Sequence, residues 1–332
     1  MKKKLKKILK RKLNKKLNRI RKHLCLPPKP PPPPIECDVL AYVTNRYDNT
    51  VSVIDTTTNT VIATIPVADQ PWGVAITPDG TRVYVGTFSP NMSVIDTATN
   101  TVIATIPLGV PSIGVAITPD GTRVYAANFY GNTVSVIDTA TNTVFATIPV
   151  GNTPYSVAIT PDGTRAYVTN ALSNNVSVID TATNTVIATI PVGGYPYAIA
   201  ITPDGTRVYV VNFTSFTVSV IDTATNTVIA TISVGRYPSG VAITPDGTRA
   251  YVTNQSDNTV SVIDTATNTV IATIPVGNTP IGVAITPDGT RAYVVNEFDN
   301  NVSVIDTATN TVIATIPVGD TPLGIAIGTV CP

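Results

Sequence analysis

Residues suited to acid–base, nucleophilic or metal chemistry are scarce in this sequence of 332 residues. The single histidine, His23, lies in a lysine-rich N-terminal segment, and the only glutamates are Glu36 and Glu297. The chain after residue 36 therefore offers no histidine to ligate a haem and no cluster with metal-ligand spacing. An acid–base pair would have to come from the loop carboxylates Asp69, Asp257, Glu297, Asp299 and Asp320. No pattern pairs any two of these, so we predict no catalytic residue, no metal site and no cofactor.

Those carboxylates lie in a repeat that fills most of the chain. The phrase Ser-Val-Ile-Asp occurs seven times, from Ser52 to Ser303, at one step of 41 residues and then steps of 42. Each unit holds four short β-branched segments separated by Asn, Asp, Gly and Pro, and Thr-Pro-Asp-Gly-Thr-Arg has the composition of a tight turn. A period near 40 built from such segments is typical of a radial β-repeat.

The two ends of the repeat region indicate a closed ring. The region begins with the strand 42–45, without the strand that precedes it in other units, and ends with that missing strand at 324–327. A C-terminal strand that completes the first sheet removes the open edge. We therefore predict an all-β, seven-bladed propeller of four-stranded blades at 38–332, after a basic helical arm at 1–24 and a proline-rich spacer at 25–37.

Two cysteines lie where the ring is expected to close. Aligned with a complete unit, Cys37 and Cys331 fall at the places of Asp288 and Gly289, on either side of a missing hairpin. These places are neighbours, so we predict a disulfide between the two cysteines; the alternative is two close but unpaired thiols. A disulfide would indicate an oxidising compartment. It would leave Cys25 free to make an intermolecular bond.

Charge divides the chain into a basic arm and an acidic body. Residues 1–34 hold 14 Lys and Arg and no acid, whereas the rest holds 8 Arg and 21 acids, for a net charge of −13. Apolar residues recur every three or four positions in the arm, at Leu5, Leu9, Leu13, Leu17, Ile20 and Leu24. This spacing predicts an amphipathic helix at 1–24 that binds an anionic surface or polymer, such as lipid headgroups, nucleic acid or a cell-wall polyanion. The alternatives are a solvated tail without a partner and a homo-oligomer, in which the arm docks on another copy's acidic body and Cys25 locks the contact.

Ala-Tyr-Val-Thr-Asn appears at 41–45, 166–170 and 250–254. With Ser-Val-Ile-Asp and Thr-Pro-Asp-Gly-Thr-Arg, it resembles the YVTN family of β-propeller repeat proteins over residues 38–328. The resemblance implies a propeller of a kind frequent on bacterial and archaeal surfaces, with lactonase-like and cofactor-bearing propellers among the wider relatives. Together with the cysteines it favours a cell-surface or extracellular location, although we find no signal peptide and no apolar stretch long enough to span a membrane.

In a propeller of this strand order, the Pro-Asp-Gly and Asp-Thr-Ala-Thr-Asn turns share one face and the other two loops share the opposite face. The first pair hardly varies, so we expect it to be structural, with each repeated arginine paired to an aspartate of its blade. The second pair varies and holds nearly all the aromatic residues outside the repeated tyrosine. These are Tyr47, Trp72, Phe88, Phe129, Tyr130, Tyr155, Tyr195, Tyr197, Phe213, Phe216, Tyr237 and Phe298.

We predict that these aromatic residues bind a glycan or a protein partner; the alternative is that they cover the loop bases and plug the channel. The chain as a whole is then a non-enzymatic binding or structural propeller with an anchoring arm. Other functions stay open: a lactonase-like hydrolase with clustered acids on the variable loops, a self-assembling structural protein, a nucleic-acid protein that uses the arm alone, and a spacer module without a ligand.

Overall fold

The computed structural model describes residues 2–24 and 37–331. The chain divides into two compact units, Met1–Glu36 and Cys37–Pro332, and we treat each by itself. Cys25 and the predicted spacer, except for Cys37, lie outside the described residues. Within the described residues, no helix combines the length and the apolar character that crossing a bilayer requires.

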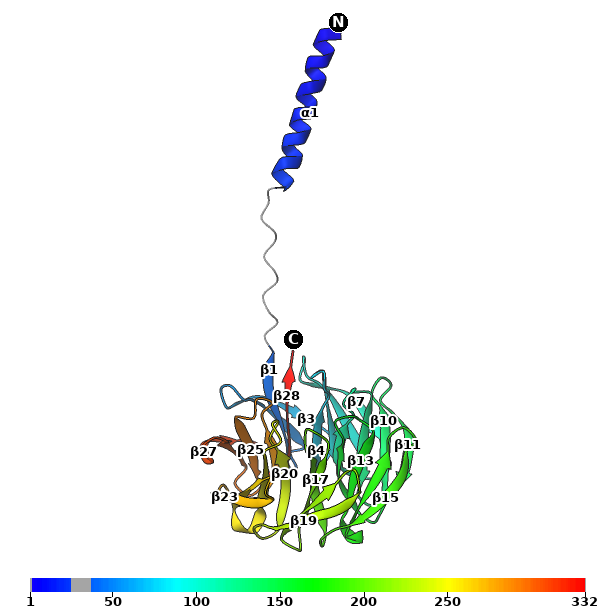
Figure 1. Ribbon diagram of the computed structural model, residues 1–332, viewed down its shortest axis with the longest axis vertical. Helices are drawn as coiled ribbons and strands as arrows, with labels where there is room; N and C mark the ends of the chain where they lie inside the picture. Colours follow the sequence, from blue (N-terminus) through cyan, green and yellow to red (C-terminus); the bar gives the residue numbers. More distant parts are fainter. Residues whose placement is uncertain (1, 25–36, 332) are drawn as a thin grey trace. The chain divides into compact units, whose positions relative to one another are not determined.

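The first unit contains one helix, α1 (Lys2–Leu24), where an amphipathic helix was predicted (Figure 1). Lysine, arginine and leucine all have high helix propensity, and neither glycine nor proline interrupts the segment. The described side chains of α1 are exposed throughout, the leucines included.

The second unit (Figure 1) is a ring of seven four-stranded antiparallel sheets. The inner strand of each sheet contacts the inner strand of the next. Blades one to four, from inner to outer strand, are β28 (Pro322–Val330), β1 (Asp38–Asn45), β2 (Thr50–Asp55), β3 (Thr60–Pro66); β4 (Pro71–Ile76), β5 (Arg82–Thr87), β6 (Asn91–Asp96), β7 (Thr101–Pro107); β8 (Ser112–Ile117), β9 (Arg123–Asn128), β10 (Thr133–Asp138), β11 (Thr143–Pro149); and β12 (Pro154–Ile159), β13 (Arg165–Asn170), β14 (Asn175–Asp180), β15 (Thr185–Pro191).

Blades five to seven are β16 (Pro196–Ile201), β17 (Arg207–Asn212), β18 (Thr217–Asp222), β19 (Thr227–Ser233); β20 (Pro238–Ile243), β21 (Arg249–Asn254), β22 (Thr259–Asp264), β23 (Thr269–Pro275); and β24 (Pro280–Ile285), β25 (Arg291–Asn296), β26 (Asn301–Asp306), β27 (Thr311–Pro317). Two short 3₁₀ turns, η1 (Ala171–Ser173) and η2 (Gln255–Asp257), follow β13 and β21. The predicted seven-bladed propeller is confirmed.

The core lies between adjacent blades rather than within a single sheet. In one such layer, Tyr167 and Val178 of blade four pack with Val208 and Ile221 of blade five, and all four are fully buried. The second and third strands are therefore covered on both faces, which explains their unbroken runs of β-branched and aromatic residues. The outer strands alternate between exposed and more buried positions, because their outward side chains face solvent.

The repeated tyrosine and arginine link neighbouring blades at all junctions but one. Tyr209 donates its hydroxyl to Asn268 Oδ1 at 3.1 Å, and Arg207 Nη1 donates to the Thr265 carbonyl at 2.6 Å. This pair of bonds occurs at six of the seven junctions between blades. The expectation that each arginine pairs with an aspartate of its blade is wrong, because Asp204 and its equivalents instead accept hydrogen bonds from the threonines of their own turns.

The asparagine that ends each Tyr-Val-Thr-Asn strand holds its own blade together. Asn212 Nδ2 donates to Thr217 Oγ1 at 3.1 Å and to Ser219 Oγ at 2.9 Å, and so ties the second strand to the serine of Ser-Val-Ile-Asp in the third. The asparagine of the Tyr-Val-Thr-Asn strand and the serine of Ser-Val-Ile-Asp are thus bonded to each other within the blade.

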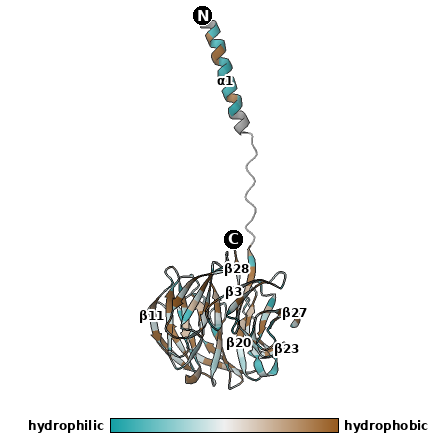
Figure 2. Cartoon of the chain, turned by 180° about the vertical axis from the view of Figure 1, so that it is seen from behind, coloured by the Kyte–Doolittle hydropathy of each residue, from teal (hydrophilic) through white to brown (hydrophobic). Residues whose placement is uncertain are grey.

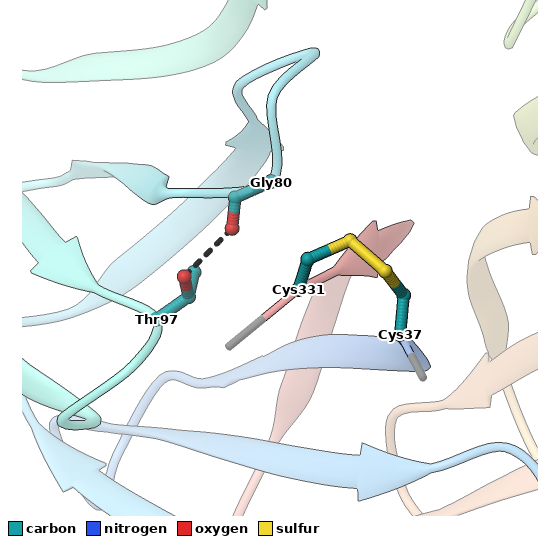
Figure 3. Close-up of a disulfide and its surroundings, with 4 residues drawn as sticks. All are labelled: Cys37, Gly80, Thr97 and Cys331. Carbon is teal, nitrogen blue, oxygen red and sulfur yellow. Dashed lines mark hydrogen bonds between the residues drawn. A yellow bond between two sulfur atoms is a disulfide. The ribbon is translucent and has the colours of Figure 1, made fainter. Parts of the chain in front are cut away.

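The ring closes as predicted, by pairing the C-terminal strand with the first one. β28 runs antiparallel to β1, with Ala41 opposite Ile327. Beyond these strands, Cys37 and Cys331 form the predicted disulfide, with their Cα atoms 4.3 Å apart and a sequence separation of 294 (Figure 3). The first blade is therefore built from both ends of the propeller.

The junction between blades one and two differs from the other six. Leu40 takes the place of the linking arginine, and the Tyr42 hydroxyl and Asn100 Oδ1 are both buried without a hydrogen-bond partner. Burial, with a smaller effect of the Asp96 carboxylate, raises the pKa of Tyr42 to about 12. The disulfide lies close to this junction, beside the bond from Thr97 Oγ1 to the Gly80 carbonyl (Figure 3).

Candidate functional site

The strand order separates two kinds of loop. The turns between first and second strands and between third and fourth strands share one end of the ring, which we call the constant face. The loops between second and third strands and between successive blades share the other end, which we call the variable face. In the constant face the turn side chains bond one another, so the candidate site is on the variable face, where the repeat diverges.

Ten aromatic residues of the variable face form one continuous chain of ring contacts, which we call the aromatic crescent. Its members come from blade two round to the start of blade six: Trp72, Phe88, Phe129, Tyr130, Tyr155, Tyr195, Tyr197, Phe213, Phe216 and Tyr237. All ten were among the predicted binding residues. The other two, Tyr47 and Phe298, are 61% and 67% exposed and make no ring–ring contact within the described chain.

The inner members of the aromatic crescent lie over the central channel. Tyr155 is the second residue of β12 and is only 8% exposed; its ring centroid lies 3.7 Å from that of Tyr197, the second residue of β16. The ring of Trp72, the second residue of β4, lies nearly perpendicular to the Tyr155 ring, at a centroid distance of 6.2 Å. The Tyr155 hydroxyl has no hydrogen-bond partner among the described residues, and burial raises the pKa of both tyrosines well above the ordinary value.

The outer members are open to solvent. Tyr130 is 64% exposed and packs its ring edge-on against Phe129 at a centroid distance of 4.7 Å, while Tyr237 contacts Phe213 and Phe216 at 5.0 Å. The inner rings fill the channel mouth, and the outer rings form an accessible shelf beside it.

A cavity of about 190 Å³ lies in the channel at the level of the second to fourth residues of the inner strands. Its wall is largely apolar, and the third residue of most inner strands is glycine. A Cβ atom on Gly73 would lie 2.0 Å from the Ile113 carbonyl oxygen, so glycine is required where neighbouring inner strands approach this closely.

The rest of the variable face is a polar sector, formed by blades six, seven and one. The first residue after the second strand is phenylalanine in blades two, three and five, but Gln255, Glu297 and Arg46 in the polar sector. Arg46 donates to Gln70 Oε1 at 3.1 and 3.3 Å, and its guanidinium carbon lies 5.2 Å from the Trp72 ring centroid. The charge of this sector therefore reaches the edge of the aromatic crescent.

Glu297 is the carboxylate of the polar sector whose pKa is raised. Partial burial raises its pKa, while the positive charge of Arg46 acts in the opposite direction. Asp257 forms an ion pair with Arg236 at 2.7 Å, and Asp299 accepts a bond from the Asn278 amide. Glu297 and Asp299 share the loop after β25, whereas Asp257 lies in the loop after β21, and the described structure gives no hydrogen-bonded pair of carboxyl groups. No group of three His, Cys, Asp or Glu side chains in residues 2–24 and 37–331 could hold a metal ion.

Two parts of this site were not predicted from the sequence. Ile113 lies in the base of the aromatic crescent, and Leu172 is 64% exposed on the variable face. The second residues of the inner strands are structurally equivalent and include Trp72, Ile113, Tyr155 and Tyr197. Alignment of the units at this position would have identified the ring that surrounds the channel mouth.

Residues 113–205 and 164–249 each match the family model of the YNCE-like β-propellers, and residues 35–156 match that of the cytochrome D1 haem domain. The first match agrees with the Tyr-Val-Thr-Asn strands and the seven blades. The chain is a seven-bladed β-propeller with YVTN-type repeats. A search of curated proteins gives no match.

Solved structures similar to this YVTN-type propeller have varied descriptions. Hydrazine synthase from Kuenenia stuttgartiensis is 27% identical, with a TM-score of 0.74 over 80% of this chain and 92% of that one. A functionally unknown protein from Desulfotomaculum acetoxidans DSM 771 is 19% identical, with a TM-score of 0.78 over 87% and 98%. A candidate 6-phosphogluconolactonase from Bacteroides uniformis ATCC 8492 is 19% identical, with a TM-score of 0.74 over 88% and 100%.

The match to a haem domain raises the question of whether this propeller fits a haem. Its residues do not fit a histidine-ligated one, because the only histidine of the chain is His23, in the arm. Met92 is fully buried between blades two and three, and Cys37 and Cys331 are bonded to each other. We therefore derive no haem chemistry for this chain.

Proposed function

We propose that the chain is a binding protein whose variable face holds a glycan, and that the arm anchors it to an anionic partner. One observation carries the proposal: ten aromatic rings in mutual contact gather on the variable face, around the mouth of the channel. Exposed apolar patches of this kind on a soluble domain usually mark an interaction surface.

The aromatic crescent and its surroundings suit a saccharide. The C–H face of a sugar ring packs against the electron-rich face of an aromatic ring, and exposed rings such as Tyr130 and Tyr237 offer this contact. Arg46, Gln70 and Glu297 lie at the edge of the same surface and supply donors and acceptors for sugar hydroxyls. An extracellular or cell-surface location agrees with this function and with the disulfide.

A glycan array probed with the full chain tests this proposal. Replacing two exposed rings, Tyr130→Ser with Tyr237→Ser, should weaken binding of any glycan found by roughly 10–100-fold, since truncating an interface anchor costs about 1–2 kcal/mol. Phe145→Ser is the matched control, because Phe145 is an equally exposed ring on the outer strand β11. Absence of glycan binding, or binding that survives the double substitution, contradicts the proposal. If the same two tyrosines instead bind a protein partner, the ligand of the variable face is a protein and not a glycan.

A lactonase-like hydrolase is the second candidate, and the pair of Glu297 and Arg46 favours it. A carboxyl group with a raised pKa is suited to general acid–base catalysis near neutral pH, and a nearby arginine can bind an anionic substrate. An assay of sugar-lactone hydrolysis, in which the released acid is titrated at constant pH, tests this function. Activity of the full chain that Glu297→Gln abolishes supports the hydrolase, whereas rates equal to those without protein contradict it.

A further inference from the structure

The helix α1 presents an apolar stripe with no partner among the described residues of its own unit. Leu5, Leu9, Leu13 and Leu17 are spaced four residues apart and are 47–63% exposed, and Ile8 between them is 51% exposed. Residues four apart in a helix differ by about 40° in direction, so these side chains form one slowly turning stripe. Figure 2 shows this composition as hydrophobic positions within a mainly hydrophilic helix.

The remaining surface of α1 is strongly basic. Between Lys4 and Arg19 it carries nine lysines and arginines, and α1 has no acidic residue. Asn18 lies on the side opposite Leu9 and Leu13, because nine residues turn a helix by about 180° and five residues by about 140°. Asn14 lies about 140° from Leu9 and about 100° from Leu13. The helix therefore needs a partner that accepts positive charge and apolar side chains at the same time.

Three anionic partners differ in what they offer the stripe. A nucleic acid backbone would neutralise the lysines but would leave the leucines in water. The constant face of a second copy offers aspartates, but its turns consist of Thr, Asp, Asn, Ala, Pro and Gly, with no large apolar residue. The surface of an anionic bilayer offers phosphate groups directly above acyl chains, so it matches both chemistries of one helix.

We propose that α1 binds in the plane of an anionic phospholipid bilayer, with the leucine stripe at the acyl boundary and the lysines and arginines among the headgroups. This inference rests on the anchoring role proposed above and makes the partner specific. α1 lies on the bilayer rather than crossing it, because its charges leave no apolar span of sufficient length.

Flotation of the full chain with lipid vesicles tests the proposal. Vesicles of phosphatidylcholine mixed with phosphatidylglycerol should bind the protein at least about tenfold more strongly than vesicles of phosphatidylcholine alone. Leu9→Ser with Leu13→Ser should reduce that binding about tenfold or more, since the charge is unchanged and only apolar contact is lost. Asn14→Ser with Asn18→Ser is the matched control and should bind as the parent does.

The two pairs of variants make each outcome decisive. If the leucine variant floats as well as the parent, or if neither vesicle binds, the proposal is overturned. Tighter binding to duplex DNA than to the vesicles, equal in the parent and the leucine variant, assigns the arm to nucleic acid instead. The same preparations are also applied to the glycan array, because the propeller is unchanged in every α1 variant. Loss of vesicle binding with glycan binding intact overturns only the proposal for α1. Loss of glycan binding with vesicle binding intact overturns only the proposal for the variable face.

Discussion

The constant and variable faces are built from the same repeat, yet they use their polar residues differently. On the constant face, Asp204 accepts bonds from Thr202 and Thr206, and Arg207 reaches across to the Thr265 carbonyl of the next blade. On the variable face, the Tyr155 hydroxyl has no partner, and Glu297 is partly buried with no hydrogen bond to its side chain in the described residues. The side chains of the repeated constant-face turns are therefore bonded within the fold, whereas these two divergent side chains of the variable face make no such bonds.

The largest difference between the faces should appear when the disulfide of the constant face is removed. Cys37→Ser with Cys331→Ser should lower the free energy of unfolding by up to about 5 kcal/mol, because the cross-link restrains a very long loop in the unfolded chain. Tyr130→Ser with Tyr237→Ser on the variable face should change it by about 1 kcal/mol or less. Denaturant unfolding in a Cys25→Ser background measures both, and similar losses for the two pairs would remove the contrast.

A second comparison uses one arginine from each face. Arg207→Met removes a charge-assisted bond and leaves the Thr265 carbonyl without that donor, which should cost about 1.5–3 kcal/mol. Arg236→Met breaks an exposed ion pair with Asp257 and should cost less than about 1 kcal/mol. Urea unfolding curves of the two variants give the difference directly, and a larger cost for Arg236 would show that the bonds between blades contribute little.

A third comparison uses two copies of the repeated tyrosine. Tyr209→Phe removes a hydroxyl bonded to Asn268 and should cost about 1 kcal/mol. Tyr42→Phe removes a buried hydroxyl that has no partner, so the free energy of unfolding should stay the same or rise slightly. Thermal unfolding of the two variants distinguishes these outcomes. Equal losses would mean that the first junction is bonded like the other six.

The smallest effects on the melting temperature should depend on pH and have opposite signs on the two faces. Hydrogen bonds from the Thr202 hydroxyl and the Thr206 amide lower the pKa of Asp204, so its contribution to stability is present above about pH 4 and is lost as the pH falls through the folded pKa. Asp204→Asn should therefore lower the melting temperature at neutral pH, with a difference that shrinks in acid.

Glu297 gives the reverse case. Burial raises its pKa, so the folded state is disfavoured at pH values above that pKa, where the group is charged in both states. Glu297→Gln should raise the melting temperature slightly at neutral pH, and the gain should vanish as the pH falls below about 4.3, where both states are protonated. A fall in melting temperature at neutral pH would show that the attraction of Arg46 outweighs the effect of burial.

The ring, its closure and the disulfide could be predicted from the sequence, because they depend on the spacing of the repeated strands and of the cysteines. The offset between the strand at 42–45 and the strand at 324–327 fixes which strands pair, and it places Cys37 next to Cys331. The aromatic residues could likewise be placed on one face, since successive loops of an antiparallel sheet alternate between its two ends.

Contacts between blades could not be predicted in the same way. Arg207 lies two residues after Gly205 in sequence, but its partner Thr265 is 58 residues away, and only the packing of blades brings them together. The loop before β16 holds Tyr195 at a positive φ of 53°, a conformation that few residues other than glycine adopt. The positions of the rings in the aromatic crescent depend on such loop conformations, which residue types alone do not determine.

The disulfide gives the propeller a defined response to mechanical load. Tension applied through the arm, as on an anchored molecule, enters the ring at Cys37, the first described residue of the body. A covalent bond there passes the force to the C-terminal strand, so β1 cannot be peeled from β28 one hydrogen bond at a time. The tethered ring should therefore resist pulling from its N-terminal end until the bond is reduced.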